Sequence, residues 1–348
     1  MDHALREIAA GAEALDRVPG FPEVAFELLR AEGATAATLP GEDGSRPGVA
    51  AEWSLVRAVA KADGSVGRIL DGHLNAVDRL LAAGDPLASA AAARVREGHL
   101  FGLWGADPGA GEGTPAALFG SKEAPVLTGV KTFCSGAGGV DAALVMARGP
   151  EAGPPALVLV DIDGSVEIDR DWYRGSGLRA SESHLVRFDS TPVHAVIGEP
   201  GELGREPAFS HDAMRTAASW AGMADCAAEA ALADLAERRA DDSLAQLAAG
   251  RIAAAAGTID AWLEFAAVRA EAGGNDQRAV SIRLRGELAG AAGRILDEAA
   301  RACGSHPFAT GRALDRSRRD LELFTLQHRL DPLLAREGRR MLGSPEAS

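Results

Sequence analysis

The residues best suited to chemistry lie near the middle of the chain. Phe133 ends a β-rich run that begins at Pro125, and Ser135 follows two positions later. Residues two apart on a strand point to the same face. A glycine-rich stretch at 106–113 precedes them, so several backbone amides could turn toward one ligand. An aromatic face with nearby hydrogen-bond donors suits a flat redox cofactor. Taken alone, such residues are more often ordinary members of a β domain.

Two titratable residues near the C-terminal end, His328 and Asp331, are candidate acid–base groups. If this segment is one continuous helix, Asp331 lies about one turn beyond His328 on the same face. Alternatively, His328 is a polar residue of a helical bundle, or the substrate needs no base. His73 could also face a cavity, although a single histidine on a helix more often serves in packing.

The common nucleotide, hydrolase and metal motifs are absent or out of context. Residues 175–180 read G-S-G-L-R-A and fit G-x-G-x-x-A, but no buried strand precedes them and no helical pattern follows. The sequence contains no P-loop, no H-E-x-x-H and no G-x-S-x-G. Because the histidines and the three cysteines show no ligand spacing, we expect no metal site.

The charge composition indicates which kinds of molecule the protein is expected to bind. The chain carries 36 basic and 50 acidic residues, a net charge of −14, which argues against nucleic acid or an anionic membrane as partner. No apolar run reaches transmembrane length, and the first residues do not resemble a secretory signal. We therefore expect a soluble, cytoplasmic protein that acts on a small molecule.

The chain divides into three segments by its periodicity. Residues 1–97 and 206–348 place apolar residues three and four apart, which predicts helices, whereas 98–205 contains short β-rich runs punctuated by Gly, Pro and Asp. We expect an N-terminal helical domain, a compact antiparallel β domain and a C-terminal four-helix bundle, an α+β fold. The predicted bundle helices are 211–239, 243–272, 277–303 and 312–338.

Several stretches resemble, in order and spacing, the motifs of the acyl-CoA dehydrogenase superfamily of flavoproteins. The run A-D-P-G-A-G-E-G at 106–113 resembles the family's T-E-P-x-A-G-S-D loop, and G-V-K-T-F-C-S-G at 129–136 resembles its G-x-K-x-W-I-[TS]-N strand. Residues 177–193 resemble the G-x-R-x-S hairpin, and 302–305 with 316–320 resemble the G-G and Y-R-D elements. The resemblance implies the same three-part fold and a bound flavin: FAD, or alternatively FMN or reduced flavin.

The resemblance also implies a cofactor site, but one part of it matches poorly. In the family, an R-x-x-F-G element and a later Gln reach the cofactor of a neighbouring subunit; here Arg239 and Gln246 correspond, but F-G is missing. Asp241 and Asp242 near a pyrophosphate would be unfavourable, which puts tight FAD retention in doubt. Alternatively, Asp242 or Ser243 caps the next helix. The implied cofactor-binding residues are Trp104, Asp107, Gly109, Gly111, Phe133, Ser135, Arg239, Gln246 and Gly304.

Both positions of the family's catalytic glutamate are vacant. Counting eight residues from Asp320 gives His328, and the matching pair on the first bundle helix is Met214-Arg215. The family default is α,β-dehydrogenation of an acyl thioester, with hydride transfer to flavin N5. A histidine near position 328 and F-C-S-G-A at 133–137 also resemble the dibenzothiophene-monooxygenase branch, which takes reduced flavin and O2. A catalytically degenerate paralogue is the third alternative.

The family resemblance implies partners as well. We expect a homodimer or homotetramer formed through the bundle. Reducing equivalents would be exchanged with an electron-transfer flavoprotein if the protein is a dehydrogenase, or with a flavin reductase if it is a monooxygenase. The substrate would be a small molecule, an acyl-CoA in the dehydrogenase case.

Overall fold

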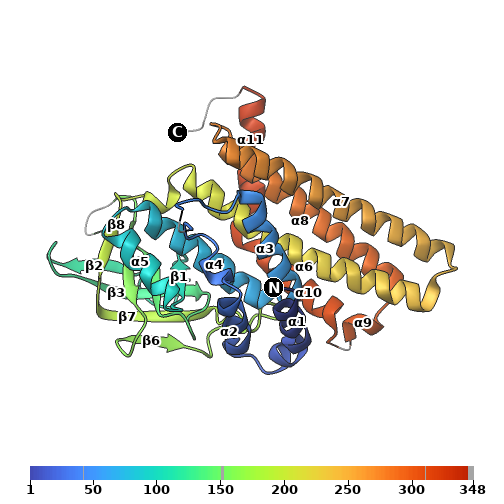
Figure 1. Ribbon diagram of the computed structural model, residues 1–348, viewed down its shortest axis with the longest axis horizontal. Helices are drawn as coiled ribbons and strands as arrows, with labels where there is room; N and C mark the ends of the chain where they lie inside the picture. The colour runs from blue at the N-terminus through green and yellow to red at the C-terminus, as the bar shows by residue number, and fades with distance from the viewer. Residues whose placement is uncertain (42, 150–152, 310, 344–348) are drawn as a thin grey trace.

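The computed structural model describes residues 1–348 except 42, 150–152, 310 and 344–348, and it does not describe the side chain of His328. In Figure 1 the N-terminal helices lie between a β region and a long helical bundle. Among the described residues, no helix combines the length and apolar character needed to cross a membrane. The N-terminal elements are α1 (Asp2–Arg17), α2 (Glu23–Ala31), η1 (Ala34–Ala36), α3 (Val49–Ala62), α4 (Gly64–Ala82) and α5 (Leu87–Arg96).

The β region consists of two four-stranded sheets, one ordered β1-β4-β5-β8 and the other β2-β3-β7-β6. The prediction of a wholly antiparallel domain is wrong in one place, because β1 runs parallel to β4. Between these two strands the chain crosses to the other sheet and forms the β2–β3 hairpin, so β4 can return in the direction of β1. The strands are β1 (Phe101–Trp104), β2 (Ala117–Gly120), β3 (Pro125–Cys134), β4 (Ala142–Ala147), β5 (Ala156–Asp161), β6 (Val166–Asp169), β7 (His184–Pro192) and β8 (Ala195–Ile197).

The C-terminal part is the expected helical bundle, and the predicted α+β fold is confirmed. The last predicted helix, however, is not continuous. It ends at Phe324, and a short 3-10 turn follows before Arg329, whose φ of 40° breaks the helix. The elements are η2 (Glu202–Gly204), α6 (Ala208–Arg239), α7 (Ser243–Ala272), α8 (Gln277–Cys303), α9 (His306–Ala309), α10 (Ala313–Phe324), η3 (Thr325–His328) and α11 (Leu330–Met341).

Small residues bring α3, α4 and α6 into close contact. A Cβ added at Gly222 would lie 2.1 Å from the carbonyl oxygen of Arg57, and one at Gly67 would lie 2.5 Å from the Cα of Ala60. Only glycine fits such separations, which explains why an alanine-rich sequence with few aromatics can form this core. The close packing fixes both α4 and α6 against α3.

A buried ion cluster joins α6 to the N-terminal helices. The Arg215 guanidinium is 4% exposed and donates to Glu52 at 2.5 Å, to the Asn75 side chain at 2.5 Å and to Asp78. Nearby, Arg79 donates to Asp212 at 2.6 Å. Arg215 belongs to the Met214-Arg215 pair, which lies at the family's second glutamate position. Because these bonds engage its guanidinium, Arg215 holds the helices together.

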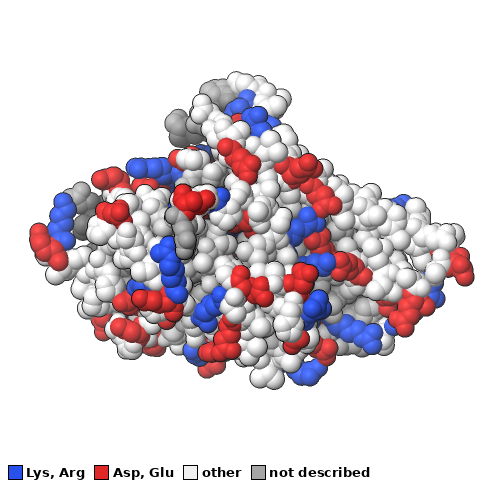
Figure 2. All heavy atoms as spheres, viewed as in Figure 1, with Lys and Arg blue, Asp and Glu red and all other residues white. Residues whose placement is uncertain are grey.

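On the face shown in Figure 2, acidic and basic side chains are interspersed and no large basic patch gathers.

Candidate active site

Phe133 is an exposed aromatic residue in a strained conformation. Its φ is 51°, at an irregularity in the pairing of β3 with β7, and its side chain is 53% exposed. Trp172 meets it edge-on, with ring centroids 4.9 Å apart. A non-glycine residue with positive φ costs about 1–3 kcal/mol and is concentrated at functional sites. An exposed ring held in such a conformation offers a stacking face to a flat ligand.

The loop that follows β1 is tied to this aromatic pair. Glu112 accepts a hydrogen bond from Nε1 of Trp172 at 2.8 Å, and its other carboxylate oxygen accepts from the backbone amide of Gly109 at 2.6 Å. The Gly109 amide is thus engaged within the loop. Gly111 has φ 85°, a value that glycine adopts without strain. The loop therefore has a fixed shape beside Phe133.

The predicted cofactor residue Asp107 is held by two cations. Its carboxylate accepts from Nζ of Lys131 at 2.8 Å and from Arg148 at 3.1 Å. Burial alone would raise the pKa of Asp107, but these ion pairs lower it. Since Lys131 is itself 1% exposed, the pair anchors the loop to β3.

Ser135 lies just beyond the end of β3, so the alternation rule used to predict its direction does not apply to it. Its amide donates to the carbonyl of Phe133 at 2.9 Å, which makes a tight turn. Trp104 is 1% exposed and donates from Nε1 to the Ser135 carbonyl at 3.0 Å, so it supports this turn from within the core. The Ser135 hydroxyl lies 2.8 Å from that of Ser183.

The residues predicted to reach a pyrophosphate lie elsewhere. Arg239 and Gln246 flank the short α6–α7 connection, at the opposite end of the bundle from β3 (Figure 1). Arg239 donates to the carbonyl of Ala302 at 3.2 Å, and Gln246 donates to that of Ala240 at 2.9 Å. Gly304 ends α8 with φ 72°. Within one subunit, the structure does not bring these residues to Phe133.

The alternative reading of the aspartates after Arg239 is confirmed. The Asp242 carboxylate accepts from the amide of Leu244 at 2.9 Å and caps α7.

The structure gives a different answer for each of the three candidate bases. The prediction that Asp331 shares a helical face with His328 is wrong, because Arg329 breaks the helix between them and Asp331 lies exposed in the first turn of α11. The side chain of His328 lies outside the described residues. His73 is fully buried, bonded to the carbonyl of Thr35 at 2.8 Å and to the amide of Phe101 at 3.0 Å. It therefore serves in packing, and burial lowers its pKa to about 4.

Asp320 joins the bundle to the segment before β7. Its carboxylate accepts from the amide of Leu178 at 2.5 Å. Burial, which is the largest effect, raises the pKa of Asp320 to about 7; the Leu178 bond opposes this and Asp63 adds to it. The folded protein thus keeps a proton that the unfolded chain releases near pH 4.

We expect the stability of the protein to fall as pH rises from about 4 to 7, by at most about 1.4 kcal/mol per pH unit from this one group. Asp320→Asn removes the titration while keeping an oxygen for Leu178. Its melting temperature should therefore change less between pH 5 and 7 than that of the wild type. Scanning calorimetry at several pH values measures this, with the exposed Asp189→Asn as control. Equal pH slopes for wild type and Asp320→Asn would contradict the prediction.

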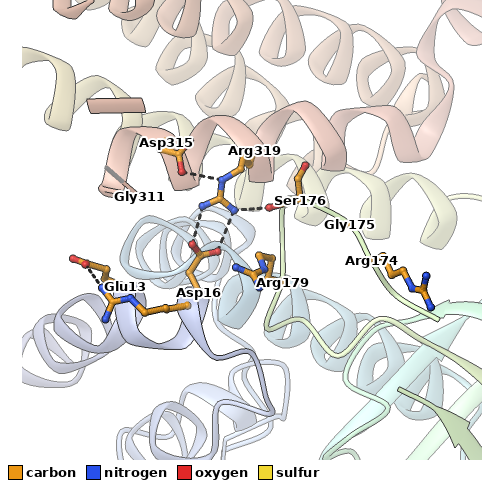
Figure 3. A pocket seen from close by; sticks show the side chains of 10 residues that line it. Glu13, Asp16, Arg174, Gly175, Ser176, Arg179, Gly311, Asp315 and Arg319 are labelled. Atoms are coloured by element: carbon orange, nitrogen blue, oxygen red, sulfur yellow. Dashed lines mark hydrogen bonds and ion pairs between the residues drawn. The ribbon is translucent and has the colours of Figure 1, made fainter. Parts of the chain in front are cut away.

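A separate cleft of about 540 Å3 lies between α1, the segment before β7 and α10. Figure 3 shows Arg319 inside it, paired with Asp16 at 2.7 Å and with Asp315 at 2.9 Å, and bonded to the carbonyl of Ser176. Arg17 pairs with Glu13 along the same side. The predicted cofactor residues do not line this cleft. Among the described residues, no group of three His, Cys, Asp or Glu side chains could hold a metal ion.

The sequence was compared with those of known proteins. No family model matches the chain. It is 30% identical over 215 residues to the dibenzothiophene monooxygenase of Rhodococcus erythropolis, an alignment covering 56% of this chain and 48% of that protein. The chain thus spans about half the length of the curated relatives it matches.

Solved structures extend the likeness to the whole chain. The FMN-bound TdsC of a Paenibacillus species has a TM-score of 0.87 at 19% identity, over 99% of this chain and 97% of that one. The methanesulfinate monooxygenase MsuC of Pseudomonas fluorescens has a TM-score of 0.84 at 20% identity, over 99% and 98%. The chain therefore has the acyl-CoA dehydrogenase-like fold, and its predicted resemblance to this superfamily of flavoproteins, including the dibenzothiophene-monooxygenase branch, is confirmed.

Proposed function

We propose that this chain is a flavin-dependent monooxygenase that uses reduced FMN and O2 to oxidise a small organic substrate. The observation that carries the proposal is the 30% identity over 215 residues with dibenzothiophene monooxygenases. The two vacant glutamate positions support it, because α,β-dehydrogenation needs a carboxylate over the substrate. Met214 is fully buried and Arg215 is bound by Glu52 and Asp78, so neither supplies that group.

The residues around Phe133 fit a flavin. A bound flavin supplies the two-electron chemistry and the reaction with O2. Phe133 offers the stacking face, Trp172 and Glu112 limit one side of it, and Ser135 adds a hydroxyl at the end of β3.

FMN suits the described residues better than FAD. The adenosine half of FAD would need the pyrophosphate element after α6, and here that connection is only residues 240–242. Arg239 and Gln246 already bond to backbone carbonyls, and two aspartates lie between them. FMN ends at a single phosphate and lacks the pyrophosphate and adenosine that this element would hold. FMN is also the flavin in the TdsC structure.

The electrons would come from a separate flavin reductase. The sequence matches G-x-G-x-x-A twice, at 111–116 between β1 and β2 and at 175–180 between β6 and β7, and neither match lies between a buried parallel strand and a helix. A nicotinamide coenzyme needs that strand–loop–helix setting for its pyrophosphate. The chain is therefore expected to receive flavin that is already reduced.

The outer face of α7 supports self-association. An apolar stripe of exposed residues follows one side of this helix at spacings of three and four, which suits close contact with a second helix. A second copy of this chain is the occupant that we propose, in a homodimer or homotetramer. The stripe consists of Leu247, Gly250, Ala254, Gly257, Ala261, Phe265 and Val268.

Gly257→Glu is expected to dissociate the assembly, because an unpaired carboxylate would be buried between the two helices. A side chain at Gly257 meets nothing in its own subunit, so the subunit should still fold. Gly11→Glu on α1, where a side chain also meets nothing, is the matched control. Sedimentation velocity should show a smaller species for Gly257→Glu only. An unchanged sedimentation coefficient would exclude this face.

The function is tested with the purified protein and FMN. We expect added FMN to shift its visible spectrum, and the reduced, FMN-loaded protein to transfer an oxygen atom from labelled O2 to dibenzothiophene as a probe substrate. A protein that shifts no flavin spectrum would overturn both enzymatic readings and favour a degenerate paralogue. Anaerobic bleaching of the bound flavin by an acyl-CoA would overturn the monooxygenase proposal in favour of dehydrogenation.

A further inference from the structure

The cleft between α1, the segment before β7 and α10 carries more positive charge than its own carboxylates neutralise. Its volume of about 540 Å3 is typical of small-molecule sites. The charged residues that line it are Arg17, Arg174, Arg179, Arg319, Glu13, Asp16 and Asp315. All three carboxylates lie in ion pairs with Arg17 or Arg319. Within the part of the chain that the structure describes, no carboxylate pairs with Arg174 or Arg179, and Arg174 donates only to the carbonyl of Asp171 at 3.1 Å.

The backbone that carries Arg179 into the cleft is strained and held on both sides. Leu178 has φ 48°, and its amide donates to the buried carboxylate of Asp320 at 2.5 Å. A Cβ added at Gly177 would lie 2.1 Å from the carbonyl oxygen of Arg319, so only glycine lets this segment approach α10 so closely. Backbone strain of this kind is concentrated at functional sites. The fold thus fixes the base of a side chain whose guanidinium has no carboxylate partner within the described chain.

We infer that this cleft binds the phosphate group of a small molecule, with Arg174 and Arg179 as its ligands. A phosphate monoester carries a charge of about −1.5 to −2 at pH 7 and has three acceptor oxygens, which suits two unpaired guanidiniums. Arginine can donate two parallel N–H bonds to such a group. The chain has a net charge of −14, so unpaired cations in one cleft are not a general property of its surface.

The inference goes beyond the proposed function, because the predicted cofactor residues do not line the cleft. The phosphate can belong to a separate molecule or to FMN itself, since the segment that lines the cleft begins two residues after Trp172, which packs against Phe133. In either case a bound phosphate would restrain the segment that positions Trp172. The two sources share one chemistry and are separated by experiment.

Calorimetric titration with ribose 5-phosphate, in the absence of flavin, tests the site. The wild type should bind ribose 5-phosphate and not ribose. Arg179→Met should weaken this binding about tenfold or more, the worth of a hydrogen bond to a charged group. Arg174→Met should act in the same direction. Arg6→Met removes the same charge from an exposed position of α1 outside the cleft, so it should leave binding unchanged.

The source of the phosphate is identified by comparing FMN with riboflavin, which lacks that group. If Arg179→Met weakens the binding of FMN but not of riboflavin, the cleft holds the phosphate of FMN. If it weakens neither, a separate phosphorylated molecule occupies the cleft. The melting temperature of Arg179→Met without ligand should equal that of the wild type, because no ion pair is lost.

The inference is overturned if the wild type binds ribose 5-phosphate no better than ribose, or if Arg179→Met binds it as tightly as the wild type does. Neither result bears on the proposed function. That function fails instead if the wild type binds no FMN, and the titration with ribose 5-phosphate then still decides whether the cleft is a phosphate site.

Discussion

Arg215→Met is expected to lower the free energy of unfolding by about 3–5 kcal/mol, the usual cost of breaking a buried ion pair from one side. The Arg215 side chain is 4% exposed, and the carboxylates of Glu52 and Asp78 that it pairs with are 12% and 26% exposed. Removing the guanidinium leaves these charges and the Asn75 oxygen without their partner. Urea denaturation followed by circular dichroism measures the loss.

Arg46→Met provides a matched control, because Arg46 also pairs with Asp78. Its side chain is 50% exposed and the separation is 3.2 Å, so its removal should cost less than about 1 kcal/mol. If both variants lose the same stability, the cluster is solvated and the buried-pair argument fails. The expected difference would show that the second glutamate position of the superfamily has become structural in this chain.

Sequence periodicity was sufficient to place the long helices. The limits of α7 and α8 match their predicted limits, because strong local signals mark their ends: Asp242 caps α7 and Gly273 ends it with φ 66°, while Gly304 ends α8. These signals act over a few residues, so they can be read without knowing the fold.

The features that the sequence analysis did not predict depend mostly on distant parts of the chain. The strands β2 and β8 are short and acquire their pairing from β3 and β5, which no local pattern reveals. The parallel pairing of β1 with β4 depends on the path of the chain between them. The break at Arg329 is different, because Pro332 gave a local signal for it: proline has no N–H to donate to residue 328 in a continuous helix, and the prediction followed the periodicity past it.

The sequence predicted only some of the residues of the candidate site. Phe133 and Ser135 came from one motif, but Trp172, Glu112 and Ser183 join them only after β3, β6 and β7 pair. The sequence analysis did not single out Trp172, although D-W-Y at 171–173 places a tryptophan beside a charged residue in a loop and is a signal that could have identified it. The domain limits at 97 and 205 stay a prediction, as does His328 as a base.

Phe133→Ala is expected to weaken FMN binding by about 1–3 kcal/mol, the usual worth of an aromatic face stacked on a flat heterocycle. This corresponds to a dissociation constant roughly 5 to 150 times larger. The ring is already exposed and its backbone strained, so its loss removes little packing inside the protein. Fluorescence titration of FMN measures the affinity, and the melting temperature without FMN should be nearly unchanged.

Phe119→Ala separates stacking from general exposure. Phe119 lies on β2 of the same sheet and is 56% exposed, close to the 53% of Phe133, but among the described residues no aromatic ring packs against it. Its removal should leave FMN affinity unchanged, whereas Phe133→Trp, with the larger ring that the superfamily usually has, should retain binding. Equal affinities for Phe133→Ala and wild type would place the flavin away from β3. In that case the strain at Phe133 would need a structural cause.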